Sequence, residues 1–317
     1  MLAVGTSTKV ALILDTTNLK LRRAFRIPKA PTSMCFSRDK SYVVIGDRAG
    51  HVCRYTVEAS EKSGYIDMNG EECDCEGEPL TSTISMVLDV AITNDGNYLL
   101  SADRDEKIRV SRYPQAFVIQ SFCLGHAAYV SSLAQNGSRV FSCGGDGVVH
   151  EWDIQNGQSI AHSVKLGDEP LRKLCISPMV SKSESIGIFA IGGCTIFRLD
   201  DKLRLMKSVK ATNEIVDITV QENEVITLSN AGVQLVKADT GDLRDATITN
   251  DLSEALTAAR DPISNYFKNV THQNMVDYFK RKAEKIEHMR ENQNRKRKAK
   301  ELRRREAKKV AKEAAAC

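Results

Sequence analysis

No run of eighteen consecutive apolar residues occurs in the 317 residues, so the sequence predicts no membrane-spanning helix and no membrane partner. The first residues lack a charged segment followed by an apolar stretch and a small-residue cleavage site, so we expect no secretory signal. Enzyme motifs are missing as well: there is no phosphate-binding Walker sequence, no nucleophile elbow and no zinc-protease helix. These absences favour a protein that is not an enzyme.

Histidine and cysteine are present, but not at the spacings that catalysis or metal binding requires. The six histidines do not pair with carboxylates or thiols at catalytic or ligand spacing. The nine cysteines are an odd number, and several fall inside apolar strand patterns, which indicates reduced thiols in an intracellular protein. Cys73 and Cys75 are the only close pair, and without a second pair or histidines we expect no zinc site. The sequence predicts no metal, cofactor or catalytic residue in this chain.

The net charge of +4 hides an asymmetry between the body and the tail. Residues 280–317 contain 16 Lys and Arg against 6 Asp and Glu, whereas the remaining residues contain 29 against 35. A mildly acidic body with a basic tail indicates nucleic acid near the tail, an import signal, or both.

One stretch in the middle of the chain has the signature of a four-stranded propeller blade. Gly-His is followed by an apolar strand and then by a Gly-rich hairpin that closes in Trp-Asp. We expect His126 to hydrogen-bond the Ser142 hydroxyl and Ser142 to accept from the Trp152 indole, so we assign His126 a structural role. In this pattern Asn136 replaces the acidic member usually found in the turn. Four aspartates are expected to satisfy turn amides: Asp89, Asp103, Asp105 and Asp146.

Hairpins of this kind recur along the chain. If Gly50, Glu106, Gly147, Gly193 and Gly232 are equivalent, the intervals are 56, 41, 46 and 39 residues, close to the ~40–45 residues of a propeller blade. The pattern accounts for six or seven blades, and we favour seven because an unpaired blade would expose a sheet edge. Two apolar runs near the start, Leu2–Gly5 and Val10–Leu14, are expected to form a strand pair that completes the last blade.

The chain therefore divides into three parts. Residues 1–250 are predicted to be an all-β WD-repeat β-propeller, with an acidic loop inserted at 58–79. Residues 251–290 are predicted to be a C-terminal helical segment, because apolar residues recur at intervals of three and four. Residues 291–317 are a basic tail that has little to bury and is expected to be disordered alone.

Two segments resemble a specific WD-repeat family, the Wuho family of non-catalytic subunits of the tRNA (guanine-N7)-methyltransferase. In the first, Asp103–Ser111 reads DRDEKIRVS, with Ser111 in the place where most blades have an aromatic residue, and Gly125-His126 follows. The second runs from Tyr266 to Lys282 and is similar to the C-terminal helix of that family. The resemblance implies a heterodimer in the nucleus. The catalytic partner would bind S-adenosylmethionine and methylate N7 of a variable-loop guanosine in tRNA, while this subunit would dock against the partner and stabilise it.

The resemblance also implies a docking surface on the distinctive blade and on the segment after His126. Ser132 stands where some family members have a basic residue, so a charged contact there is not expected. Without the resemblance, the charged hairpin would be interpreted as a solvated turn. The predicted partner-docking residues are Asp103, Arg104, Glu106, Lys107, Arg109 and Tyr129.

The basic tail supplies two further groups of candidate residues, and a solvated helix face explains the first group equally well. Phosphate contacts to tRNA are predicted for Lys280, Arg281, Lys282 and Lys285. A nuclear import patch is predicted for Arg295, Lys296, Arg297, Lys298, Arg303, Arg304 and Arg305.

Two other functions stay open at this point. A nuclear WD-repeat scaffold of another complex, in ribosome assembly or as a ubiquitin-ligase substrate receptor, would share the blades and the tail. It would have no reason to carry both matched segments. A protein that binds nucleic acid alone through its tail is the third candidate, and the acidic body makes it the weakest.

Overall fold

Short apolar runs separated by polar turns pair in chain order into antiparallel sheets. The computed structural model describes residues 1–58, 65–66, 72–73, 77–177, 186–221, 224–237, 242–246 and 280–284. Two compact units are distinguished, Met1–Arg260 and Asp261–Cys317. The first unit holds all the described strands, and the all-β prediction is confirmed for it.

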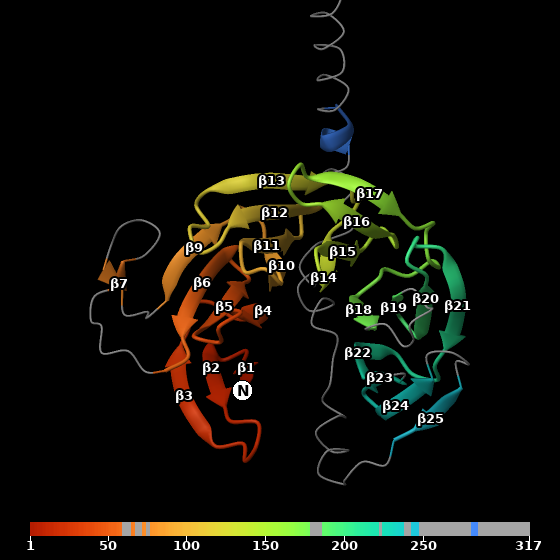
Figure 1. Cartoon of the computed structure of the whole chain (residues 1–317), viewed down its shortest axis with the longest axis horizontal. Helices are drawn as coiled ribbons and strands as arrows, with labels where there is room; N and C mark the ends of the chain where they lie inside the picture. The colour runs from red at the N-terminus through yellow and green to blue at the C-terminus, as the bar shows by residue number, and fades with distance from the viewer. Residues whose placement is uncertain are drawn as a thin grey trace, which may run out of the picture. The chain divides into compact units, whose positions relative to one another are not determined.

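Six sheets follow one another along the first unit (Figure 1), and we number them blades 1 to 6. Blade 1 has three strands, and blades 2 to 6 have four each. Their strands are β1 (Leu2–Gly5), β2 (Val10–Leu14) and β3 (Leu21–Arg26); β4 (Pro31–Phe36), β5 (Tyr42–Asp47), β6 (His51–Thr56) and β9 (Glu78–Ser82); β10 (Val87–Ile92), β11 (Tyr98–Asp103), β12 (Lys107–Arg112) and β13 (Ile119–Leu124); β14 (Val130–Asn136), β15 (Arg139–Gly144), β16 (Val149–Asp153) and β17 (Gln158–His162); β18 (Lys173–Ser177), β19 (Gly187–Gly192), β20 (Thr195–Leu199) and β21 (Leu205–Lys210); β22 (Ile215–Gln221), β23 (Glu224–Ser229), β24 (Gly232–Lys237) and β25 (Leu243–Asp245).

The described residues form six blades, whereas the sequence left six or seven open and favoured seven. A seventh blade would need strands from outside these residues. The expectation for the first strands was wrong: β1 pairs with β2 and β2 with β3, so they form blade 1. They add nothing to the last sheet, whose strands β22 to β25 are consecutive in the chain.

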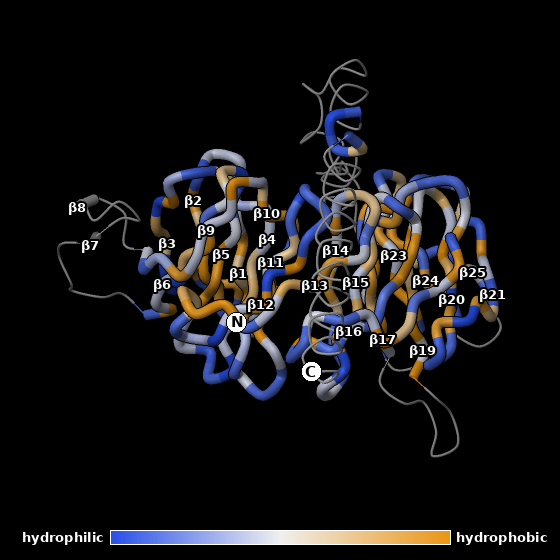
Figure 2. Tube along the Cα trace, turned by 90° about the horizontal axis from the view of Figure 1, so that it is seen from above, coloured by the Kyte–Doolittle hydropathy of each residue, from blue (hydrophilic) through white to orange (hydrophobic). Residues whose placement is uncertain are grey.

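The core of the first unit lies between neighbouring blades rather than inside any one sheet. Each of five apolar clusters joins residues of two consecutive blades. Between blades 3 and 4, for example, Leu100 and Ile108 pack with Val140 and Trp152. Hydrophobic residues follow the strands and mostly hydrophilic turns lie at their ends (Figure 2). Each sheet therefore needs its neighbours to bury both faces, which is the reason for the repeat.

The hairpin alignment made from the sequence is supported by backbone geometry. Gly50, Gly147 and Gly193 have φ angles of 94°, 77° and 55°, and Gly232 has 152°. Glu106 occupies the equivalent position in blade 3 with φ of 70°, although it has a side chain. A left-handed residue therefore stands at this position in blades 2 to 6, and glycine is the residue that adopts this conformation most readily.

The acidic insertion at 58–79 contains a short hairpin, in which β7 (Tyr65–Ile66) pairs with β8 (Glu72–Cys73). Its last two residues already belong to β9, and residues 59–64, 67–71 and 74–76 lie outside the described part.

In the second unit, residues 280–284 are helical, as expected within the 251–290 segment. The other residues of that segment and all of 291–317 lie outside the described residues. Among the residues that the structure describes, no helix is long and apolar enough to span a membrane.

Candidate docking hairpin and blade network

The hairpin between β11 and β12 is closed by Asp103. Its side chain is buried, and its Oδ1 accepts hydrogen bonds from the backbone N–H of Asp105 (2.9 Å) and of Lys107 (3.1 Å). Burial raises the pKa of Asp103 and outweighs these two hydrogen bonds. Asp103 therefore shapes the turn, as predicted for it, and is not placed to meet a partner directly. The same prediction was wrong for Asp89, which lies in β10 and accepts hydrogen bonds from Ser33 Oγ of blade 2 (2.6 Å) and from the N–H of Leu133 of blade 4 (2.7 Å).

Arg104 and Lys107 lie at the exposed end of this hairpin. The Arg104 side chain is 40% exposed, and its Nε lies 3.9 Å from Asp105 Oδ1, a loose ion pair in solvent. Lys107 is exposed at the start of β12, and Glu106 between them is half-buried. The two cations that the resemblance favoured most are thus the accessible ones.

Arg109 differs from the other two cations because it reaches across to the preceding blade. Its Nη1 donates to the carbonyl oxygen of Ser82, the last residue of β9, at 2.7 Å. Its Nε is buried without a hydrogen-bond partner, and burial lowers the pKa of the guanidinium. Within the described residues no carboxylate forms an ion pair with Arg109. It therefore links blades 2 and 3, and the sequence could not show this role.

Tyr129 comes from the loop that enters blade 4. The ring is half-buried and packs against Gly145, where an added Cβ would lie 2.6 Å from Tyr129 Cε1. The Tyr129 carbonyl accepts from the Gly145 N–H at 2.9 Å. Ser132, three residues later, is buried, and its Oγ accepts from Leu174 N in blade 5. The position that is basic in some family members is therefore an internal contact here.

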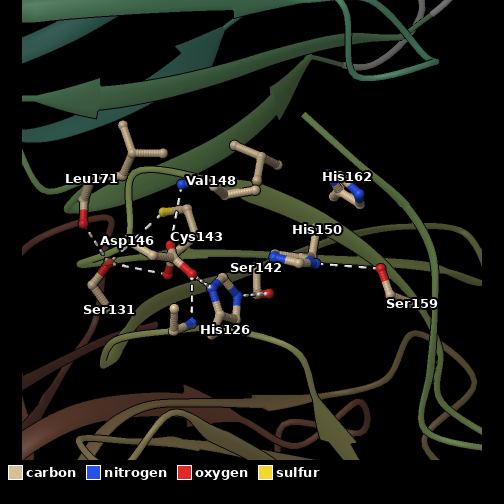
Figure 3. A network of polar contacts seen from close by, with 12 residues as sticks. His126, Ser131, Ser142, Cys143, Asp146, Val148, His150, Ser159, His162 and Leu171 are labelled. Carbon is tan, nitrogen blue, oxygen red and sulfur yellow. Dashed lines mark hydrogen bonds and ion pairs between the residues drawn. The ribbon is translucent and has the colours of Figure 1, made fainter. Parts of the chain in front are cut away.

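The predicted polar network of blade 4 is present. His126 Nε2 lies 2.7 Å from Ser142 Oγ (Figure 3). Trp152 Nε1 donates to the same oxygen, also at 2.7 Å. The prediction about the acidic member was wrong. Asp146, in the β15–β16 turn, lies 2.8 Å from His126 Nδ1, and Asn136 takes no part in the network.

Asp146 also accepts hydrogen bonds from the backbone N–H groups of Ala127 and Val148, at 3.0 and 3.1 Å. Burial opposes ionisation, but the hydrogen bonds with His126 and these amides outweigh it and lower the pKa of Asp146. In the hairpin alignment Asp146 stands one residue before the left-handed Gly147, whereas Asp47 and Asp103 stand three residues before Gly50 and Glu106.

His150 lies beside this network. Its ring is 4.4 Å from that of His126 and stacks on Trp152 with centroids 5.1 Å apart. Ligand atoms of His126, Asp146 and His150 come within 4.8 Å of one another, which resembles a metal site. However, both ring nitrogens of His126 are already engaged by Asp146 and Ser142, so this cluster is better explained as a structural network.

A hollow of about 620 Å³ lies elsewhere, between the Thr93–Asp95 turn of blade 3 and the Asp153–Gln155 turn of blade 4. Its most buried charges are satisfied, because Arg139 binds Glu151 through two hydrogen bonds of 2.6 and 2.9 Å. The hollow does not include the β11–β12 hairpin.

The predicted tail residues are described only in part. Lys280 and Arg281 are exposed in the 280–284 helix, and Lys282 is half-buried. Lys285 and the predicted import patch, 295–298 and 303–305, lie outside the described residues.

The sheet arrangement defines the class of protein as a WD-type β-propeller. A solved structure, "Crystal structure of WD40 beta propeller domain of Doa1", superposes with a TM-score of 0.61 at 10% identity and covers 78% of each chain. That likeness concerns the fold alone. The sequence profile described as "tRNA methyltransferase TRM82 WD40 domain" matches residues 56–249, more than half of the chain, and the chain belongs to this family.

Curated relatives are similar to the chain over different lengths. A protein from Caenorhabditis elegans named "tRNA (guanine-N(7)-)-methyltransferase non-catalytic subunit" is 37% identical over 82% of this chain. The Aedes aegypti protein of that name, wuho, is 33% identical over 51%. The chain spans 64% of the first relative and 40% of the second. The names of both relatives support the prediction that this chain is not an enzyme.

Proposed function

We propose that this chain is the non-catalytic subunit of a heterodimeric tRNA (guanine-N7)-methyltransferase. The catalytic subunit would bind S-adenosylmethionine and methylate N7 of a variable-loop guanosine. The observation that carries the proposal is the family match over 56–249, which includes the hairpin with its exposed Arg104 and Lys107. The relatives' names supply the reaction.

In this proposal the propeller docks against the catalytic subunit through the Asp103–Lys107 hairpin. Asp103 holds the turn in shape, so that Arg104 and Lys107 are presented on a rigid support. Exposed cations on a fixed hairpin suit a partner surface that carries carboxylates. Tyr129, half-buried beside the next blade, is the aromatic candidate for the same interface.

The tail has a separate role in the proposal. Cations from residue 280 onward would contact tRNA phosphates next to the partner's active site, with strong salt dependence and little sequence preference. The basic clusters at 295–298 and 303–305 would serve as an import signal for a nuclear complex.

Co-expression with the candidate catalytic subunit tests this function. Gel filtration should give a 1:1 complex, and an assay for N7-methylguanosine in tRNA should show more activity than either subunit alone. If no complex forms and no activity is gained, the proposal is wrong.

A further inference from the structure

The cations of the docking hairpin share a face of blade 3 with exposed apolar side chains. In the β12–β13 pair, Lys107 lies opposite Leu124 and Arg109 lies opposite Phe122. Residues directly opposite one another in an antiparallel pair project to the same side of the sheet. Leu124 is 64% exposed and Phe122 is 41% exposed, although β13 is the outermost strand of its sheet.

The hydrogen bond from Arg109 to Ser82 shows which way this face points. Because Ser82 ends the outermost strand of blade 2, the face looks toward that blade. Two residues after Ser82, Ile84 has a relative exposure of 106%, the highest of the large apolar residues described.

The loop that carries Ile84 is fixed to both neighbouring hairpins. The N–H of Thr83 donates to the Gly50 carbonyl of blade 2 at 2.8 Å, and the N–H of Arg104 donates to the Met86 carbonyl at 3.0 Å. Thr83 Oγ1 also donates to the Ser85 carbonyl at 2.5 Å. Ile84 is therefore held out into solvent by a loop with several anchors, beside the hairpin that presents Arg104.

The positive charge of Arg109 on this face is not neutralised by a neighbouring side chain within the described residues. Arg109 has a buried Nε without a hydrogen-bond partner, and within the described residues no carboxylate balances its charge. The Arg109 side chain as a whole is half-buried, and a guanidinium prefers a carboxylate that accepts two parallel hydrogen bonds. A partner that brings an acidic side chain to the edge of blade 3 would supply it.

Met206 on β21, two blades away, is 62% exposed, close to the value for Leu124, and serves as the comparison for an exposed apolar residue outside this face. An apolar centre with a charged rim is the anatomy of a specific protein interface, whereas scattered apolar residues are normal on any surface.

We infer that Ile84, Phe122 and Leu124 form the apolar centre of the docking surface, with Arg104, Lys107 and Arg109 as its cationic rim. The occupant is an apolar surface of the catalytic subunit that is bordered by carboxylates. This inference rests on the proposed function and deepens it, because it places the interface on the outer wall between blades 2 and 3.

Charge-neutral substitutions separate the apolar centre from the rim. The full chain carrying Ile84→Ser and Leu124→Ser is compared with Met206→Ser, and binding to the purified catalytic subunit is measured by calorimetry at two salt concentrations. The double variant should bind about tenfold more weakly or worse, as expected for apolar residues at an interface centre. Its salt dependence should equal that of the wild type, and Met206→Ser should stay within about twofold. Equal thermal unfolding midpoints show that all variants are folded.

Three results would overturn the inference. If the double variant binds like the wild type while Arg104→Glu weakens binding, the hairpin docks but the apolar centre does not exist. If the wild-type chain alone forms a dimer that the double variant loses, the patch serves self-association. If the wild type binds no catalytic subunit at all, the proposed function itself fails.

Discussion

The carboxylate of Asp146 lies 2.8 Å from Nδ1 of His126, although twenty residues separate them in the chain. This contact fixes the imidazole so that its Nε2 faces Ser142, which in turn receives the Trp152 indole N–H. A buried network of this kind stabilises a blade only when every member is satisfied.

Replacing the acid therefore destabilises blade 4. Asp146→Asn should lower the free energy of unfolding by about 2 kcal/mol, because the amide has one acceptor oxygen whereas the carboxylate uses two. Urea unfolding followed by Trp152 fluorescence measures the loss. The matched control is Asn136→Ala, which should change stability by less than about 0.5 kcal/mol. A larger loss of stability from Asn136→Ala than from Asp146→Asn would mean that the network depends on Asn136 rather than on Asp146.

Stability should fall as the pH is lowered through the titration of His150. Burial, together with His126, lowers the pKa of His150 to about 4, whereas an unfolded chain has a histidine pKa near 6.5. Between these values the unfolded state binds a proton that the folded state does not. Acidification from about pH 6.5 to 4 therefore favours unfolding, by up to about 3 kcal/mol.

The His150→Gln variant tests the assignment. Urea unfolding at several pH values should show a flatter dependence between pH 6.5 and 4 than in the wild type. An unchanged slope would mean that another group causes the loss.

Two glycines with positive φ should respond differently to alanine. At Gly50, with φ of 94°, an added Cβ would lie 2.2 Å from the Thr83 carbonyl oxygen and must displace the backbone. At Gly137, with φ of 59°, nothing lies within 4 Å. Thermal unfolding should show a loss of about 2 kcal/mol or more for Gly50→Ala and about 1 kcal/mol for Gly137→Ala. Equal losses would argue against the tight loop around residue 83.

Ending the chain at Phe279 removes 16 basic residues. The truncated complex should bind tRNA more weakly, and the slope of log affinity against log salt should fall by about 2 or more. Binding to the catalytic subunit should not change. A second truncation that removes only 291–317 separates the helix cations from the rest, and an unaltered slope in both would remove the phosphate role from the tail.

Local patterns predicted most of the fold, because each blade is built from strands that are neighbours in the chain. The turn aspartates and the left-handed positions recur at visible spacings, which is why Gly50 and Glu106 could be aligned. Contacts between blades were harder to predict. The link from Arg109 to Ser82 crosses 27 residues, and the exposure of Leu124 depends on how β13 meets the adjacent blades. The role of Asp146 was missed because the acid was sought in the β14–β15 turn rather than in the β15–β16 turn.

The docking hairpin is tested most directly by charge reversal. Arg104→Glu with Lys107→Glu should weaken binding to the catalytic subunit at least about tenfold and reduce its salt dependence. The fold should stay intact, because both side chains are exposed. Lys202→Glu, an exposed cation in the β20–β21 turn, is the matched control and should bind like the wild type. Unchanged affinity of the folded double variant would contradict the account.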